Sequence, residues 1–228
     1  MKILSFSLYG ENPIYTIGAI KNAKLKQHIF PEWEMWIYYN DTVPKKIIEE
    51  LKKFEKIKLI FMDEDNKFVN SMWRFLPASE SNVEYFISRD ADSRISERDS
   101  TAVQEWINSN KLYHIIRDHP IGHAWPINAG MWGCKGNTIC NISEQIKNYI
   151  IGKNYYEKSI DQCFLRDVIY PKTLNSLFLH DEYYNYEKIG KAIKRDRKKD
   201  KFAFIGESLD ENDIPRGDQR SPIISRYK

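Results

Sequence analysis

Short apolar runs alternate with amphipathic patterns along most of this chain, and this alternation limits the folds open to it. Runs typical of buried strands occur at residues 2–8, 33–39, 58–62 and 84–88. Helical patterns lie between and after them, at residues 14–28, 43–56, 71–76 and 96–108. Strands that alternate with helices predict an α/β domain whose central sheet is largely parallel.

The second half of the chain continues this pattern. Further strands are predicted at residues 112–116 and 130–133, and further helices at 142–151 and 160–169. Pro171 should end the last of these helices. Neither a repeat nor a linker precedes residue 186, where the composition shifts toward charge. We therefore expect one domain over residues 1–185, and a basic C-terminal extension over 186–228 that packs on it or trails from it.

The composition indicates a globular protein of a reducing compartment. The chain has 228 residues, of which 42% are hydrophobic, enough to bury a sizeable core. Its apolar runs are too short to cross a bilayer, and residues 1–9 lack the features of a signal peptide. Three cysteines without a C-x-x-C pair indicate neither a disulfide framework nor a zinc site. We expect a cytoplasmic protein.

The net charge of +3 is unevenly distributed. Residues 188–201 contain eight basic and two acidic side chains, so this segment is strongly basic and the remainder slightly acidic. Such a segment can be a solvated surface of the domain. Alternatively, it can be a patch that binds the inner surface of an anionic membrane or a lipid phosphate. Nucleic acid is not an expected partner, because the cluster is local and lacks interleaved aromatic residues.

Two aspartates one residue apart follow the predicted strand at 84–88. Alternate side chains of an extended chain point to the same side, so Asp90 and Asp92 can reach one cation. Carboxylates suit a hard divalent ion such as Mn²⁺ or Mg²⁺. The alternative is an acidic strand end that pairs with the neighbouring Arg89 and Arg94.

Another pair of aspartates, Asp63 and Asp65, also follows an apolar run. A solvated turn explains this pair. We prefer Asp90 and Asp92 because arginines flank them and a helical pattern follows them.

Four further segments carry residues suited to a ligand site. Asn128, Ala129 and Gly130 combine an amide with a small-residue turn that a sugar could approach closely. The other three place a cation early in the chain, a carboxylate beside an amide at a helix start, and a histidine after an apolar run: Arg74, Asp161 with Gln162, and His180. The cation could meet phosphate or the paired aspartates.

Taken in order, these segments resemble glycosyltransferases of the GT-A fold. The paired aspartates, Asn-Ala-Gly, Asp-Gln and a late histidine are similar to glycosyltransferase family 8, the glycogenin and galactosyltransferase group. Small single-domain glycosyltransferases of bacteria and large DNA viruses look closer in four segments, at residues 73–77, 90–94, 117–120 and 126–133. The resemblance spans residues 1–181 and implies a single GT-A (Rossmann-like) catalytic domain with a mostly parallel sheet flanked by helices.

The resemblance also implies a metal and nucleotide site. Asp90 and Asp92 would hold Mn²⁺ or Mg²⁺, with His180 as a third ligand. Tyr9 and Gly10, beyond the first strand, would lie near the base, for which the resemblance suggests uracil. The bound donor would then be a UDP-sugar.

The donor sugar and the reaction centre follow from the same resemblance. The sugar would face residues 128–130, and Asp161 with Gln162 would line the reaction centre. Cys163 stands where the family 8 pattern has a further aspartate, so retention or inversion of configuration stays open.

Glycosyl transfer sets clear chemical demands. Negative charge builds on the diphosphate as its bond to the sugar breaks, and a metal would offset it. Arg74, Arg89 or Arg94 could add bidentate contacts to the phosphate oxygens. Asp161 is the first candidate for the base that takes the acceptor proton, and Asp118 is the second. In a retaining enzyme, Asp161 would instead stabilise the cationic sugar.

The sequence thus favours a metal-dependent glycosyltransferase that acts on a glycan or lipid-linked acceptor in surface polysaccharide or glycan synthesis. A nucleotidyltransferase also holds metal on aspartates at a strand end, but residues 79–88 lack its usual Gly-Ser turn. A non-catalytic nucleotide- or sugar-binding module of the same fold stays open.

Two polar segments have two interpretations each. Residues 117–123 form an active-site loop or an ordinary polar loop. Residues 208–220, rich in aspartate, form a lid over the donor or a surface tail.

Overall fold

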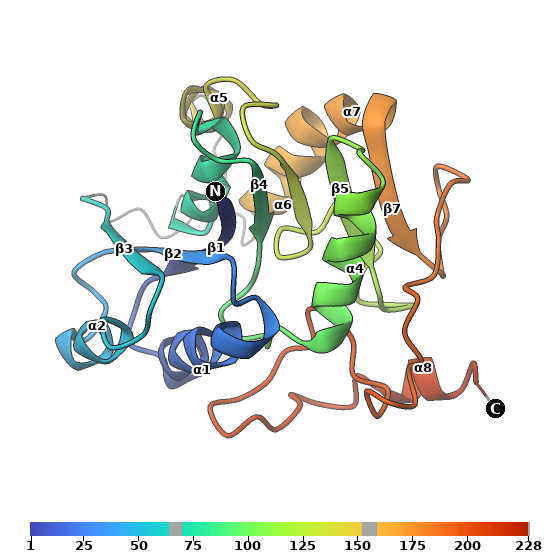
Figure 1. The fold of residues 1–228 in the computed structure, drawn as a ribbon, viewed down its shortest axis with the longest axis horizontal. Helices are drawn as coiled ribbons and strands as arrows, with labels where there is room; N and C mark the ends of the chain where they lie inside the picture. Colours follow the sequence, from blue (N-terminus) through green and yellow to red (C-terminus); the bar gives the residue numbers. More distant parts are fainter. Residues whose placement is uncertain (64–69, 152–158, 228) are drawn as a thin grey trace.

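The computed structural model describes residues 1–63, 70–151 and 159–227. Within these residues, seven strands form one sheet in the order β3-β2-β1-β4-β6-β5-β7 (Figure 1). The strands are β1 (Lys2–Leu8), β2 (Glu34–Tyr39), β3 (Ile57–Phe61), β4 (Tyr85–Ser88), β5 (Tyr113–Arg117), β6 (Trp132–Lys135) and β7 (Leu177–Asp181). The strands predicted from the sequence are confirmed within one or two residues, and β7 is an additional one.

The sheet is parallel except for β6. Strand β1 pairs in parallel with β2 and β4, β2 with β3, and β5 with β7. Strand β6 runs antiparallel between β4 and β5, with Phe86 opposite Cys134 and Ile115 opposite Trp132. The expected single-domain α/β fold with a mostly parallel sheet is therefore confirmed. The carboxyl ends of β1, β2 and β4 meet at one edge, where ligands bind in such sheets.

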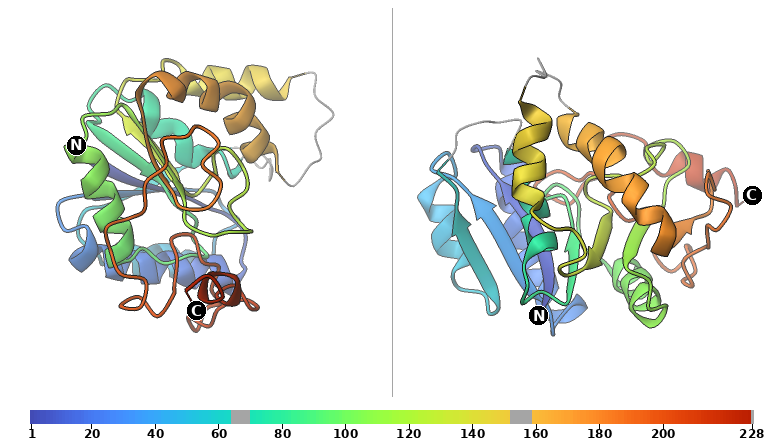
Figure 2. Two further views of the ribbon diagram at one scale, coloured as in Figure 1. Left: turned by 90° about the vertical axis from the view of Figure 1, so that its right-hand side faces the viewer. Right: turned by 90° about the horizontal axis from the view of Figure 1, so that it is seen from above.

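Helices cover both faces of the sheet (Figure 2). One face of the sheet is covered by α1 (Pro13–Ile29), α2 (Lys45–Leu51) and α4 (Glu97–Asn108). These helices bury an apolar cluster together with alternate strand residues such as Leu4 and Phe6. The opposite cluster lies under the 3₁₀ helix η1 (Trp73–Ser79), α5 (Ile142–Ile150) and α6 (Ile160–Phe164). Alternation of side chains along each strand supplies both clusters.

Helix ends follow local chemistry. Asn12 caps α1 by accepting a hydrogen bond from the N–H of Ile14 at 3.0 Å, with Pro13 at the first helical position. Ser96 caps α4 through the N–H of Asp99. The helix predicted over 43–56 is shorter, because α2 ends at Leu51 and turns follow.

Pro171 does not end the helix that begins at Ile160, contrary to the prediction. A π-helix, η2 (Leu165–Ile169), follows α6, and α7 (Tyr170–Thr173) continues from it into the 3₁₀ turn η3 (Leu174–Ser176). The proline lies in the first turn of α7, where a missing N–H costs least, and the wide π-turn precedes it.

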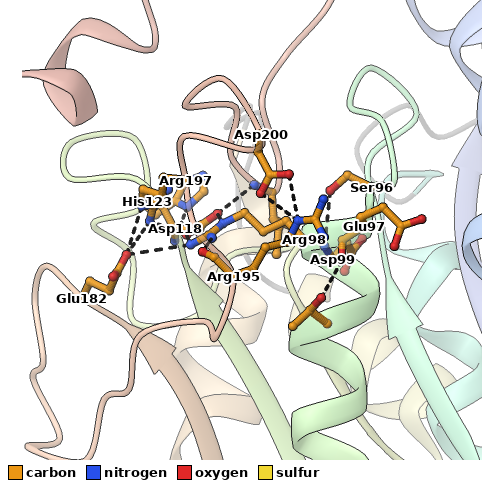
Figure 3. A network of polar contacts seen from close by, with 12 residues as sticks. Ser96, Glu97, Arg98, Asp99, Asp118, His123, Glu182, Arg195, Arg197 and Asp200 are labelled. Carbon is orange, nitrogen blue, oxygen red and sulfur yellow. Dashed lines mark hydrogen bonds and ion pairs between the residues drawn. The ribbon is translucent and has the colours of Figure 1, made fainter. Parts of the chain in front are cut away.

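The chain after β7 folds back over the domain. It crosses beside α4, forms the short helix α8 (Ser221–Ile224), and ends at the lower right of Figure 1. Arg98 on α4 donates to Asp118 at 2.8 Å, and Arg197 of the returning segment donates to the same carboxylate at 2.6 Å (Figure 3). This buried network joins the C-terminal residues to the sheet. Across the described ranges, no helix is both long and apolar enough to cross a membrane.

Candidate active site

Asp90 and Asp92 lie just beyond the end of β4, in a tight turn. The carbonyl of Asp90 accepts hydrogen bonds from the N–H of Ser93 at 3.3 Å and from its hydroxyl at 3.0 Å, which fixes the turn. Both aspartates line a cavity of about 650 Å³ at the carboxyl-end edge of the sheet. The other residues that line it are Ser7, Tyr9, Gly10, Glu11, Asn12, Tyr15, Thr42, Asn70, Ser71, Arg74, Ala91 and Asp161. For the alternative pair, Asp65 lies outside the described residues.

The guanidinium of Arg74 joins two carboxylates from distant parts of the chain. Its Nη1 donates to Asp90 Oδ1, and its Nη2 donates to Asp161 Oδ2 at 3.1 Å. The N–H of Arg74 donates to the hydroxyl of Ser7, near the end of β1, at 3.0 Å. Burial alone would lower the pKa of Arg74, but the charges of Asp90 and Asp161 outweigh it and raise that pKa. Of its two expected partners, phosphate or the carboxylates, Arg74 contacts the carboxylates.

The loop at residues 128–130 links Asp90 to the start of α6. The Gln162 side chain accepts a hydrogen bond from the N–H of Ala129 at 3.0 Å, and the carbonyl of Ala129 accepts one from Ser88 at 2.7 Å. A Cβ on Gly130 would lie 1.8 Å from Asp90 Oδ2. Because Gly130 has no side chain, the carboxylate rests directly against the backbone. The predicted Asn-Ala-Gly and Asp-Gln segments thus meet at the aspartate pair.

The electrostatics of the aspartate pair suit a cation. Burial raises the pKa of Asp92, and the nearby charge of Asp90 raises it further, while a hydrogen bond from Ser208 partly offsets both. Two carboxylates that repel each other in a cavity are stabilised by a divalent ion between them. Asp90 and Asp92 are therefore the residues that would hold the metal.

His180 is not a third ligand, contrary to the prediction. Its strand, β7, is separated from β4 by β6 and β5, a distance of roughly 14 Å at ordinary strand spacing. Its Nδ1 lies 2.9 Å from Nε2 of His114, its Nε2 lies 3.6 Å from Glu105, and burial lowers the pKa of both histidines. Within residues 1–63, 70–151 and 159–227, no group of three His, Cys, Asp or Glu side chains is placed to hold a metal.

The arginines that flank the aspartate pair donate most of their hydrogen bonds to other groups of the protein. Arg89 is buried and forms a two-point contact with Asp99 of α4, at 2.6 and 2.8 Å. Arg94 donates to Asp213 and to the carbonyls of Ala91, Ser93 and Asp210. Most N–H donors of both guanidinium groups are engaged in these contacts, so this arrangement does not favour Arg89 or Arg94 as a phosphate-binding residue.

Asp118, the second candidate base, also has a structural role. Its carboxylate accepts hydrogen bonds from Arg98, from Arg197 and from the N–H of Ile205 (Figure 3). Burial would raise the pKa of Asp118, but the two guanidinium groups lower it overall. A carboxylate with these partners is a weak base, and it does not line the cavity. Of residues 117–123, Asp118 and His123 belong to the buried network, where His123 accepts a hydrogen bond from the N–H of Asp118 at 2.9 Å, while Ile121 is exposed.

The residues expected near the nucleotide base and sugar have different placements. Tyr9 and Gly10 line the cavity, and the N–H of Gly10 donates to the hydroxyl of Thr42 at 2.7 Å. Gly10 has a φ of 74°, which favours glycine. Asn128 is buried and does not line the cavity, and its amide donates to the carbonyl of Trp125 at 3.5 Å within its own loop.

The C-terminal segment adds contacts that the sequence did not reveal. The hydroxyl of Ser208 donates to Asp92 Oδ2 at 2.8 Å, and the N–H of Leu209 donates to the carbonyl of Asp92 at 2.8 Å. No local pattern signals a partner more than a hundred positions away. This segment is part of the site's border.

No family model matches this chain, and no curated protein matches it either. Among solved structures, residues 1–349 of S. aureus TarS are similar to it, with a TM-score of 0.50 and 15% identity. The match covers 78% of this chain and 58% of that one, so this chain spans less than two thirds of the TarS fragment. The fold is GT-A-like.

This similarity supports the GT-A-like fold and does not point to glycosyltransferase family 8 in particular. A 4-diphosphocytidyl-2C-methyl-D-erythritol synthase from Anaerococcus prevotii is more distant, with a TM-score of 0.47 and 11% identity over 73% of this chain and 83% of that one.

Proposed function

We propose that this protein is a metal-dependent glycosyltransferase that moves a sugar from a nucleotide-sugar, with UDP as the expected nucleotide, to a hydroxyl acceptor. The observation that carries the proposal is the meeting of Asp90, Asp92 and Asp161 in one cavity, with Arg74 between two of them. Breaking a sugar–diphosphate bond requires a cation for the leaving group and a carboxylate near the sugar. The GT-A-like fold supports the same proposal.

The donor would lie across the carboxyl ends of β1 and β4. Its diphosphate would face Asp90 and Asp92, and Mn²⁺ or Mg²⁺ held there would neutralise the charge that builds on the leaving diphosphate. Its base would lie toward Tyr9 and Gly10, which line the same cavity. The sugar would lie beside the backbone of Gly130, which contacts Asp90.

Asp161 is the carboxylate best placed to act at the reaction centre. Its Oδ2 accepts from Arg74, and its Oδ1 accepts from the N–H of Gln162 at 2.8 Å, which leaves further lone pairs on both oxygens. In an inverting reaction Asp161 would take the proton of the acceptor hydroxyl, and in a retaining one it would stabilise the cationic sugar. Arg74 and Gln162 hold it in place for either role.

The division of the chain and its location belong to the same proposal. Residues 1–185 would form the catalytic domain, and residues 186–228 a basic extension. Within its basic stretch, residues 188–201, Arg195 pairs with Asp200, and Arg197 pairs with Asp118 and Glu182, so the positive charge that this stretch presents to solvent comes mainly from its lysines. Exposed lysines over 188–201 would suit a glycan or lipid-linked acceptor at the inner face of a membrane.

A transfer assay tests the proposal. Wild-type protein with Mn²⁺ and a panel of UDP-sugars should release UDP in the presence of acceptor, and Asp90→Asn or Asp92→Asn should lower the rate by about 100-fold or more. Asp63→Asn, the same change at an exposed aspartate, is the matched control and should match wild type. Release of pyrophosphate from a nucleoside triphosphate and a sugar phosphate, with no UDP released from UDP-sugars, would instead indicate a nucleotidyltransferase.

A further inference from the structure

The C-terminal segment forms a hairpin whose two arms both reach the aspartate pair. The N–H of Arg216 donates to the carbonyl of Ser208 at 3.0 Å, and Leu209 bridges Pro215 in antiparallel fashion. The carboxylate of Asp210 accepts from two N–H groups at the hairpin tip. Ser208 and Arg216 therefore lie opposite each other in a turn with its own hydrogen bonds.

Hydrogen bonds at its base and at its tip fasten this hairpin to the site. Leu209 and Ser208 donate to Asp92, at 2.8 Å each. At the tip, Asp213 accepts from Lys21 of α1 at 2.7 Å and from Arg94 at 2.8 Å. The segment (red in Figure 1) thus returns from the β7 edge of the sheet to the middle of α1. Its position next to the cavity is fixed.

Arg216 occupies a distinctive place on this hairpin. Its Nη1 lies 3.8 Å from Asp92 Oδ2 and donates to the hydroxyl of Ser208 at 3.3 Å. It also lies close to Tyr15, a residue that lines the cavity, and its charge acts on the Tyr15 hydroxyl. Its side chain is 48% exposed, so donors remain available on the solvent side of the guanidinium.

The other arginines near Asp90 and Asp92 are placed differently. Arg74 is divided between two carboxylates, Arg89 is buried against Asp99, and Arg94 holds the hairpin tip. Arg216 is the one among these four that combines an exposed guanidinium with a place at the cavity rim. An arginine in such a place suits the paired oxygens of a phosphate group.

We propose that Arg216 is a donor-binding residue that contacts the terminal phosphate of the nucleoside diphosphate, and that the 208–216 hairpin carries it to the site. This inference rests on the proposed function. The chain would then build its diphosphate site from the aspartate pair on one side and from its C-terminal hairpin on the other. A nucleoside monophosphate lacks the phosphate that Arg216 would reach.

The test compares binding of the nucleoside diphosphate that wild type prefers, chosen among UDP, GDP, CDP and dTDP, with binding of the matching monophosphate, in Mn²⁺, by calorimetry. Arg216→Gln should weaken the diphosphate about tenfold and change the monophosphate by less than about twofold. Arg216→Lys keeps the charge but not the planar fork of the guanidinium, so its diphosphate affinity should lie between those of wild type and Arg216→Gln. Arg226→Gln, the same change at an exposed arginine of the C-terminal segment, is the control and should match wild type.

Three results separate the outcomes. Unchanged diphosphate affinity in Arg216→Gln, beside a wild type that binds, would overturn the inference and leave the proposed function standing. Equal weakening of both ligands would show that Arg216 only holds the hairpin, and would also overturn it. A wild type that binds none of the four diphosphates would overturn the proposed function and this inference with it.

Discussion

The guanidinium of Arg74 lies 3.1 Å from the carboxylate of Asp161, which joins the 3₁₀ helix η1 to the start of α6 across the end of the sheet. The same guanidinium contacts Asp90, so one cation fixes the spacing between the proposed metal site and the proposed reaction centre. Because all three side chains are largely removed from solvent, their pairing affects both stability and chemistry.

Removing Arg74 should therefore destabilise the protein. Arg74→Leu leaves the carboxylates of Asp90 and Asp161 without their shared counter-charge, and we expect a loss of about 3 kcal/mol in the free energy of unfolding. Urea denaturation measures it. Arg166→Leu removes an exposed ion pair with Asp167 and should cost less than about 0.5 kcal/mol. Equal losses in the two variants would show that Arg74 does not hold a buried charge network.

Gly130 should be needed for the site rather than for folding. In Gly130→Ala the new methyl group would displace the Asp90 carboxylate, a flexible side-chain end, so we expect nucleotide affinity in Mn²⁺ to fall at least about tenfold with a small change in melting temperature.

Gly136→Ala provides the contrast, because its methyl group would meet the backbone carbonyl of Val83, 1.7 Å away and outside the cavity. It should lower the melting temperature and leave nucleotide affinity unchanged. Wild-type affinity in Gly130→Ala would contradict the placement of Asp90 at the ligand.

Replacing Asp161 should lower the transfer rate and leave donor binding nearly unchanged. Asp161→Asn keeps the shape of the side chain but removes its charge, so we expect the transfer rate to fall by about 10²- to 10⁴-fold with little change in UDP affinity. Steady-state kinetics with the true acceptor and calorimetry with UDP separate the two effects. Asp167→Asn makes the same change on an exposed carboxylate and should transfer normally. A full transfer rate in Asp161→Asn would remove Asp161 from the reaction centre.

Stability should fall in mild acid because of buried neutral histidines. Burial lowers the pKa of His123 to about 4, from a usual value of about 6.5. Between these two pH values the unfolded chain binds a proton that the folded protein does not, so the free energy of unfolding decreases as pH falls from 6.5 to 4. The expected slope is about 1.4 kcal/mol per pH unit for this one group.

His123→Asn isolates that contribution. An asparagine oxygen can accept the hydrogen bond that His123 now accepts from the N–H of Asp118, but it does not titrate. Urea denaturation at several pH values should give a shallower dependence in this variant, while His114 and His180, whose pKa values are also lowered, still contribute. The same slope in both proteins would mean that His123 does not titrate as its burial requires.

Much of the fold could be predicted from the sequence because its signals are local. Short apolar runs mark β1, β2 and β4, and caps such as Asn12 mark helix starts. The prediction that the helix ends at Pro171 was wrong, because a π-turn lets a new helical turn begin at Tyr170. That adjustment depends on packing, which a local pattern does not record.

The placement of a candidate residue could be predicted only where its element ends or begins at the cavity edge of the sheet. Asp90 and Asp92 follow β4, and Asp161 lies at the start of α6, so the order of elements already brings them toward one cavity. His180 was misplaced because its position in the sheet depends on strand order, and β7 lies at the far edge. The carboxylate that each arginine contacts could not be predicted either. The residue type gives the charge of an arginine, but its partner depends on the tertiary structure.

The most direct test of the central claim is the shift in melting temperature with UDP, GDP, CDP and dTDP, each with and without Mn²⁺. A ligand at a hundred times its dissociation constant should stabilise the folded protein by about 2.7 kcal/mol, which is roughly 5 to 10 °C for a chain of this size. The account predicts such a shift with one of these nucleotides, dependent on Mn²⁺ and absent in Asp90→Asn. No shift with any of the four, or a shift that Asp90→Asn retains in full, would contradict a metal–diphosphate site at Asp90 and Asp92.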